Sequence, residues 1–365
     1  MLEFEFLQIA VGNRDKFLCC PSDEEWRRLF YFAQKQSLVG FLFCGIERLP
    51  NEQLPKRDLL LKWYGMAESI KKVNVIKNVR CAELDAILRK GNFKGCVLKG
   101  QGTALLYPYQ EYRQSGDIDM WIGTSDGRLV SIDTVISYAK QRGVQVSHVD
   151  IKHADMRFFN DTQVEIHFKP SYSYNFVYDG RLKSWFKSLS KEQFDNFDSV
   201  VGFAYPTIYF NLVYSLLHIY RHLFSEGIGL RQMLDYYYIL TNSTKEERKR
   251  AYKTICRFGM KDFAGAAMFV LQDVLGLKGE YLLCESSRKS GLFLLKEILL
   301  AGNFGQYDNR ITRINKEKRI KRGFAQFARN LRFVRYYPQE VLLSPIWKCW
   351  HYGWRKMHGY LNVEF

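Results

Sequence analysis

Several features that mark common protein classes are missing from this sequence. It has no G-x-x-x-x-G-K-[ST] phosphate-binding motif, no internal repeat and no low-complexity tract. Its 8 cysteines include no C-x-x-C pair, so a zinc site is not expected and the thiols should be reduced and buried. With 365 residues, 47% of them hydrophobic, the chain is long and apolar enough for two domains or one elaborated domain.

A targeting segment is also missing from the start of the sequence. The first residues have no basic leader before an apolar stretch, so we expect no secretory signal and a cytoplasmic protein. The run from Ser199 to Tyr220 has no charged side chain and is the one candidate for a membrane span. Because Pro206 interrupts it, we expect a strand, a turn and a buried helix, with a transmembrane helix as the lesser alternative.

Acidic residues are too few to balance the basic ones. The chain has 54 Lys and Arg against 38 Asp and Glu, a formal net charge of +16. This excess suggests an anionic partner, either nucleic acid, nucleotide phosphates or a membrane surface. An ordinary solvated basic surface is an equal alternative.

The most basic segment is Arg310–Arg335, which has one acid, Glu317. It is predicted to form an amphipathic helix that binds a polyanion, lies on an acidic membrane surface or packs on the core. Its apolar residues recur every three or four positions: Ile320, Phe324, Phe327, Leu331 and Val334.

The order of periodic segments predicts an α+β fold. Helices are expected over 22–49 and 57–90. The second should bury an apolar stripe made of Leu61, Tyr64, Ala67, Val75, Val79, Ala82, Ala86 and Leu88. Short strands at 96–98, 118–122, 144–149, 156–159 and 163–168 predict a small mixed sheet. Helices should follow beyond Pro206. We therefore expect an N-terminal helical segment (1–92), an α/β core (93–205) and a C-terminal helical domain (206–365).

Two acids with one residue between them give the sharpest chemical signal. Asp117 and Asp119 flank Ile118 at the start of a predicted strand, so their side chains should share one face. Paired carboxylates can ligate Mg²⁺, although a solvated strand edge would look the same in sequence. Glu165 and His167 share a face of a later predicted strand, where Glu165 could complete a metal site or deprotonate a hydroxyl.

A Lys-Gly-x-Gly turn lies upstream of the acid pair. Lys99, Gly100, Gln101 and Gly102 follow a predicted strand and open a short helix. Small residues and a lysine at such a turn suit phosphate binding. The alternative is an ordinary strand–helix turn that needs glycine for its conformation.

These pieces together resemble the uncharacterised nucleotidyltransferase family of bacteria, within the polymerase β-like superfamily. The resemblance lies in Leu98-Lys99-Gly100, Tyr107-Pro108, Arg113 and Asp117-Ile118-Asp119-Met120, with Glu165-Ile166-His167 and parts of 217–235 downstream. It covers roughly residues 95–240. Gln101 departs from the superfamily, which usually has serine after this glycine.

The resemblance implies Mg²⁺-dependent transfer of a nucleoside monophosphate from an NTP to a hydroxyl acceptor. Asp117, Asp119 and Glu165 would be the catalytic residues and would bind two Mg²⁺ ions, with Lys99, Gly100, Gln101, Arg113 and His167 at the nucleotide. The alternative from the charge alone is a non-catalytic nucleic-acid or membrane-surface binding protein that uses the basic segment 310–335.

Overall fold

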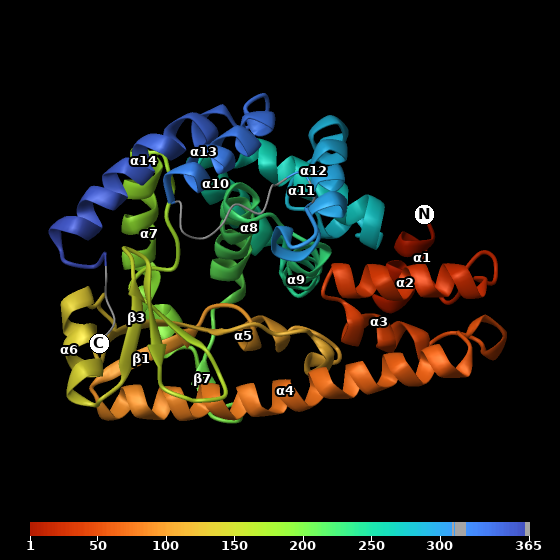
Figure 1. Ribbon diagram of the computed structural model, residues 1–365, viewed down its shortest axis with the longest axis horizontal. Coiled ribbons are helices and arrows are strands. Elements are labelled where there is room, and N and C mark those ends of the chain that lie inside the picture. Colours follow the sequence, from red (N-terminus) through yellow and green to blue (C-terminus); the bar gives the residue numbers. More distant parts are fainter. Residues whose placement is uncertain (309, 311–318, 362–365) are drawn as a thin grey trace.

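The computed structural model describes residues 1–308, 310 and 319–361, and it has a five-stranded mixed sheet with helices at both ends of the chain (Figure 1). This confirms the predicted α+β class. The strands of the main sheet are β1 (Phe93–Val97), β2 (Ile118–Thr124), β3 (Gln145–Val149), β4 (His153–Arg157) and β5 (Val164–His167), and a small hairpin joins β6 (Phe197–Asp198) to β7 (Phe203–Ala204).

Helices make up most of the rest. The N-terminal ones are α1 (Leu2–Ala10), α2 (Asp23–Lys35), α3 (Val39–Ile46) and α4 (Arg57–Lys90). The sheet region contains α5 (Gln101–Ala104), α6 (Ile132–Gln141) and α7 (Phe176–Asp195). The C-terminal ones are α8 (Ile208–Ser225), α9 (Leu230–Thr241), α10 (Lys245–Arg257), α11 (Lys261–Leu275), α12 (Arg288–Ala301), α13 (Arg319–Asn330) and α14 (Pro338–Met357).

The strand order β1-β2-β5-β4-β3 places the acid-bearing strand inside the sheet. β2 and β5 run parallel, whereas the other neighbouring pairs are antiparallel. The register sets Asp119 opposite Glu165. Because adjacent residues in register point to the same face, the two predicted acids meet there.

The two faces of the sheet pack against different helices. Ile118, Met120 and Ile122 are buried in a cluster with residues of α4 and α6. On the other face, Trp121 stacks on Phe210 of α8 with ring centroids 5.6 Å apart. The acids share this second face, which therefore directs them toward the C-terminal helices.

Helix α4 has the predicted bounds but only part of the predicted buried face. It runs beneath both the N-terminal helices and the sheet (Figure 1). The expected stripe is only partly right. Its members Ala67 and Leu88 are buried, whereas Leu61, Tyr64, Val75 and Val79 are all about half exposed. One straight helix meets α3 near one end and β1 near the other, so a single periodicity does not describe its contacts. Its buried residues are Trp63, Ala67, Asn74, Cys81, Leu84, Asp85 and Leu88.

Other expectations need correction as well. The helix expected over 22–49 is two helices, divided at Ser37 by a positive φ of 55°. The thiols are not uniformly buried, since Cys19, Cys20, Cys256 and Cys349 are exposed. The sequence reading missed α7, which begins where the Asn175 side chain accepts hydrogen bonds from the backbone N–H groups of Val177 and Tyr178.

The structure also describes much of the basic segment 310–335 and all of the uncharged run 199–220. Within 310–335, residues 311–318 lie outside the described part, and α13 ends at Asn330, earlier than expected. The run 199–220 forms β7, a turn and the first part of α8, as expected. Among the described residues, no helix has the length and apolar character needed to cross a bilayer.

Candidate active site

Three carboxylates meet at the end of β2 and β5. Asp117 is the last residue before β2, Asp119 is in β2, and Glu165 is in β5. One carboxylate oxygen from each lies within 4.8 Å of the other two. The parallel, in-register pairing of the two strands produces this arrangement, and it brings together the three acids predicted from sequence.

The charge on this trio is unevenly compensated. The neighbouring charge of Asp119, together with burial, raises the pKa of Asp117 to about 6. Burial opposes ionisation of Asp119, but the charge of Lys99 and the hydrogen bond from His167 outweigh it and lower that pKa. Burial also opposes ionisation of Glu165, but the hydrogen bond from His167 and the charge of His153 outweigh it and lower the pKa of Glu165. Asp117 is therefore the carboxylate that a bound cation would stabilise most.

His167 and Lys99 supply the compensating contacts. The His167 Nε2 lies 2.9 Å from Asp119 Oδ1 and 3.2 Å from Glu165 Oε2. The Lys99 Nζ lies 3.0 Å from the same oxygen of Asp119. His167 is only 1% exposed. In this arrangement His167 contacts the carboxylates directly.

The glycines of the Lys-Gly-x-Gly turn have identifiable structural tasks. Gly100 has a φ of 60°, where a side chain is strained, and a Cβ on Gly102 would lie 2.4 Å from the Val97 carbonyl oxygen. The Gln101 side chain is buried and donates to Asn78 Oδ1 of α4 at 2.6 Å. Lys99 and Gly100 line the cavity beside the carboxylates, whereas Gln101 is bonded to α4.

A small cavity separates the carboxylates from α8 and α9. Its volume is about 60 Å³, several times what one water molecule needs. Its lining includes Lys99, Asp117 and Asp119 from the sheet side and His218 from α8. His218 packs on His222 with ring centroids 4.2 Å apart, and burial lowers the pKa of both imidazoles.

Unpaired hydrogen-bond donors line this cavity. Arg113 Nη1, Arg231 Nε and the Tyr214 hydroxyl are buried and have no hydrogen-bond partner among the described residues. Buried donors are nearly always satisfied in proteins. Three such atoms around one cavity, with the Lys99 ammonium nearby, make it suited to an anion.

The other nitrogens of Arg113 are already bound. Nε and Nη2 donate to Asp235 of α9 at 2.7 and 2.8 Å, and the Tyr107 hydroxyl donates to the same carboxylate at 2.6 Å. Arg231 is one helical turn before Asp235 on α9, but its Nη1 donates to the Gln114 carbonyl at 2.7 Å.

A second, larger cavity also borders the carboxylates. It has a volume of about 430 Å³ and is lined by Asp117 and Glu165 together with residues 155–157 and 159–164, among them Arg157 and Phe159. Asp117 thus borders both cavities.

Sequence reasoning missed His153 and Asp155 beside the site. It placed a strand at 156–159, but β4 begins at His153, which pairs with His167, while Asp155 pairs with Glu165. The alternation His-Ala-Asp-Met was the available signal, since it puts a histidine and an acid on one strand face.

Of the comparisons with known proteins, the one with protein families gives a match. No curated protein and no solved structure matches the chain. The family described as "Uncharacterised nucleotidyltransferase" matches residues 22–276, a range that includes all three carboxylates and, apart from Phe304, the residues that line the two cavities. Because this match covers well over half of the sequence, the chain belongs to the uncharacterised nucleotidyltransferase family.

Proposed function

We propose that this protein transfers a nucleoside monophosphate from an NTP to a hydroxyl acceptor in a Mg²⁺-dependent reaction. The observation that carries the proposal is the convergence of Asp117, Asp119 and Glu165, whose carboxylate oxygens lie within 4.8 Å of one another. Carboxylates grouped in this way can hold the two metal ions that flank an in-line phosphoryl displacement.

The residues present fit Mg²⁺. The three nearest ligands are all carboxylates, the hard oxygen donors that this ion prefers, and the raised pKa of Asp117 shows negative charge that lacks a counter-ion. Asp117 and Asp119 would hold one ion and Glu165 would complete the second position. Bound there, Mg²⁺ would neutralise the triphosphate and the entering oxygen.

The small cavity is our candidate for the triphosphate. Lys99 and the unpaired donors of Arg113, Arg231 and Tyr214 line it, and they can bind phosphate oxygens without rearranging their existing hydrogen bonds. The lowered pKa of Glu165 favours a role as metal ligand over a role as proton acceptor, because a weak base removes a hydroxyl proton poorly.

The larger cavity is our candidate for the acceptor. In-line displacement requires the entering and leaving oxygens on opposite sides of the reacting phosphorus. A hydroxyl in the larger cavity and a triphosphate in the smaller one would approach Asp117 from its two bordering spaces. The lining residues Arg157, Phe159 and Asn160 suit an acceptor with polar groups and an apolar surface.

The first test is Mg²⁺-dependent binding of a non-hydrolysable NTP, measured by calorimetry. We expect the native protein to bind the NTP only when Mg²⁺ is present. Asp117→Asn and Asp119→Asn should each lower this affinity at least about 10-fold, since each removes a charged metal ligand. The matched control is Asp126→Asn, an exposed acid in the loop after β2, which should bind as the native protein does. Equal affinity in all four proteins would rule out the site.

The transfer reaction needs a separate measurement. Release of pyrophosphate from an NTP, with and without a panel of hydroxyl acceptors, should depend on Mg²⁺ and on the same two aspartates. If the nucleotide binds but no acceptor yields pyrophosphate, the chain is a nucleotide-binding protein instead.

The alternative function, binding of polyanions or membranes through 310–335, has less support. Arg310 pairs with Glu297 and Asp308, and Arg332 also pairs with Glu297. Arg329 donates to the carbonyls of Leu223 and Ser225. Three of the basic side chains of the segment therefore hold the fold together.

A further inference from the structure

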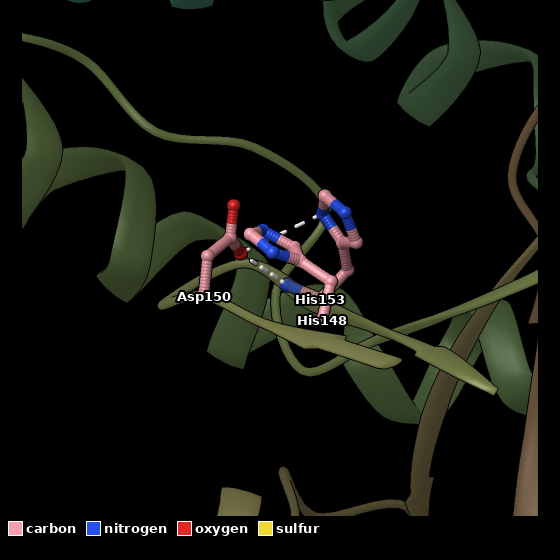
Figure 2. Close-up of side chains that lie close together, drawn as sticks. All are labelled: His148, Asp150 and His153. Atoms are coloured by element: carbon pink, nitrogen blue, oxygen red, sulfur yellow. Dashed lines mark hydrogen bonds and ion pairs between the residues drawn. The ribbon is translucent and has the colours of Figure 1, made fainter. Parts of the chain in front are cut away.

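A second group of metal-ligand side chains lies at the tip of the β3–β4 hairpin. His148 is in β3, Asp150 follows that strand, and His153 begins β4. A hydrogen bond of 2.9 Å from the Asp150 backbone N–H to the His153 carbonyl closes the turn. One ligand atom from each residue lies within 4.8 Å of the other two, and Figure 2 shows the three side chains close together.

The carboxylate of Asp150 is held in place by the turn itself. Its Oδ1 accepts hydrogen bonds from the backbone N–H groups of Lys152 and His153, both at 2.7 Å. Its side chain is 17% exposed. A ligand oriented by the backbone loses little freedom when it binds an ion, which favours affinity.

His153 has an unsatisfied ring nitrogen on the Asp150 side. Nδ1 is 3.6 Å from Asp150 Oδ1, too far for a hydrogen bond, and it is buried with no hydrogen-bond partner in the described part of the chain. The other nitrogen, Nε2, lies 3.4 Å from Asp155 and 3.8 Å from Glu165. A carboxylate at the second nitrogen is typical of metal-bound histidine, because it orients the ring.

We propose that His148, Asp150 and His153 bind one Zn²⁺ ion. Two imidazoles and one carboxylate are a common ligand set for Zn²⁺, whereas Mg²⁺ prefers oxygen ligands alone. The missing C-x-x-C pair made zinc unexpected in the sequence, but it excludes only a cysteine-rich site.

His351 of α14 is the candidate for a fourth ligand. Its Nε2 is also buried without a hydrogen-bond partner among the described residues. No ligand atom of His351 lies within 4.8 Å of all three residues of the cluster, so a change of its side-chain rotamer would have to bring it to the ion. Coordination by His351 would tie α14 to the edge of the sheet.

The ion would also connect the hairpin to the active site. With Nδ1 bound to Zn²⁺, the His153 ring is fixed with Nε2 toward Glu165 and Asp155. The hairpin site would then support the position of Glu165. The binding of Zn²⁺ itself does not depend on nucleotidyl transfer, so the two proposals can fail separately.

The test is a Zn²⁺ titration of chelator-stripped full-length protein against a chromophoric chelator, with excess Mg²⁺ present to occupy the carboxylate trio. The native chain should bind one equivalent, and Co²⁺ in its place should give visible absorption bands. His148→Gln and Asp150→Asn should each weaken Zn²⁺ at least about 10-fold, because each removes a direct ligand. His351→Gln should weaken Zn²⁺ binding less than either of these variants, because His351 lies outside the group of three close ligands.

Two control variants separate this site from others. Asp117→Asn, in the carboxylate trio, and His358→Gln, an exposed histidine at the end of α14, should bind Zn²⁺ as the native chain does. Circular dichroism of each stripped variant checks folding, and Asp150→Asn keeps an oxygen acceptor for the turn if His148→Gln misfolds. No Zn²⁺ bound by the native chain, or unchanged affinity in both ligand variants, would mean that the cluster is an ion-pair network only.

Discussion

Asp117 is the residue whose protonation should affect this protein most. Its pKa is raised to about 6 by Asp119 and by burial, above the value of 3.8 that it would have in the unfolded chain. A raised carboxyl pKa means that the folded, metal-free protein is destabilised at pH values where the group must ionise. This cost is absent below about pH 4, grows as the pH rises, and is complete above about pH 6.

We therefore predict that Asp117→Asn stabilises the metal-free protein at pH 7 and leaves its stability unchanged near pH 4. The gain at pH 7 should be about 1 to 3 kcal/mol, since each unit of pKa shift corresponds to about 1.4 kcal/mol. Urea unfolding in the presence of a chelator, repeated between pH 4 and pH 8, measures it.

Asp126 is a suitable comparison for that experiment. The hydroxyl of Thr124 lowers the pKa of Asp126, so Asp126→Asn should change stability with the opposite sign as the pH rises. If Asp117→Asn gives no gain at pH 7, the carboxylate is not the uncompensated charge that we describe.

At the scale of elements, the turn between β1 and α5 shows which parts of a motif serve conformation. Gly100 has a positive φ, and Gly102 packs directly against the Val97 carbonyl. Both positions need glycine for the conformation of the turn, whether or not a phosphate binds there. The glycines thus place Lys99 beside Asp119, and the lysine brings the charge to the cavity.

We predict that Gly102→Ala destabilises the protein by more than about 1 kcal/mol, because its Cβ would meet backbone atoms that cannot move aside. Gly100→Ala should cost about 1 kcal/mol through its strained φ. Gly65→Ala, inside α4 with no atom within 4 Å of the new Cβ, should instead stabilise the protein by about 0.5 to 1 kcal/mol. Thermal unfolding of the three variants compares them, and equal effects at all three positions would contradict this interpretation.

At the scale of the whole molecule, one buried ion pair joins the sheet region to the C-terminal helices. Arg113 follows α5 and precedes β2, whereas Asp235 is on α9, and two hydrogen bonds connect them. The Arg113 side chain is only 5% exposed. Arg80 and Asp161 form a similar pair on the surface through the Arg80 Nε and Nη2, with side chains 30% and 43% exposed.

The two pairs should differ in energy because only one is buried. Asp235→Asn should lower the free energy of unfolding by about 3 to 5 kcal/mol, since it leaves a buried arginine without its counter-ion. Asp161→Asn should cost less than about 1 kcal/mol, as usual for an exposed pair. Guanidinium unfolding measures both, and a similar loss in both variants would show that burial is not the cause.

Sequence periodicity alone was enough to find most elements. It predicted the bounds of α4 and the presence of all five strands of the main sheet, because capping residues, glycines and strand alternation are local properties. It only partly predicted which face of α4 is buried, and it did not predict that β4 begins at His153. Both depend on neighbours distant in sequence. The three-part division at residues 92 and 205 stays a prediction.

The sequence by itself determined the acid pair, the third acid, the lysine turn and the family, since each is a short pattern of residue types. Only the tertiary structure decided what these residues contact. The parallel register of β2 and β5 sets Asp119 beside Glu165. The packing of α9 places Asp235 where Arg113 donates a hydrogen bond to it. Strand pairing and helix packing bring together residues that are far apart in the chain, so no local sequence pattern predicts these contacts.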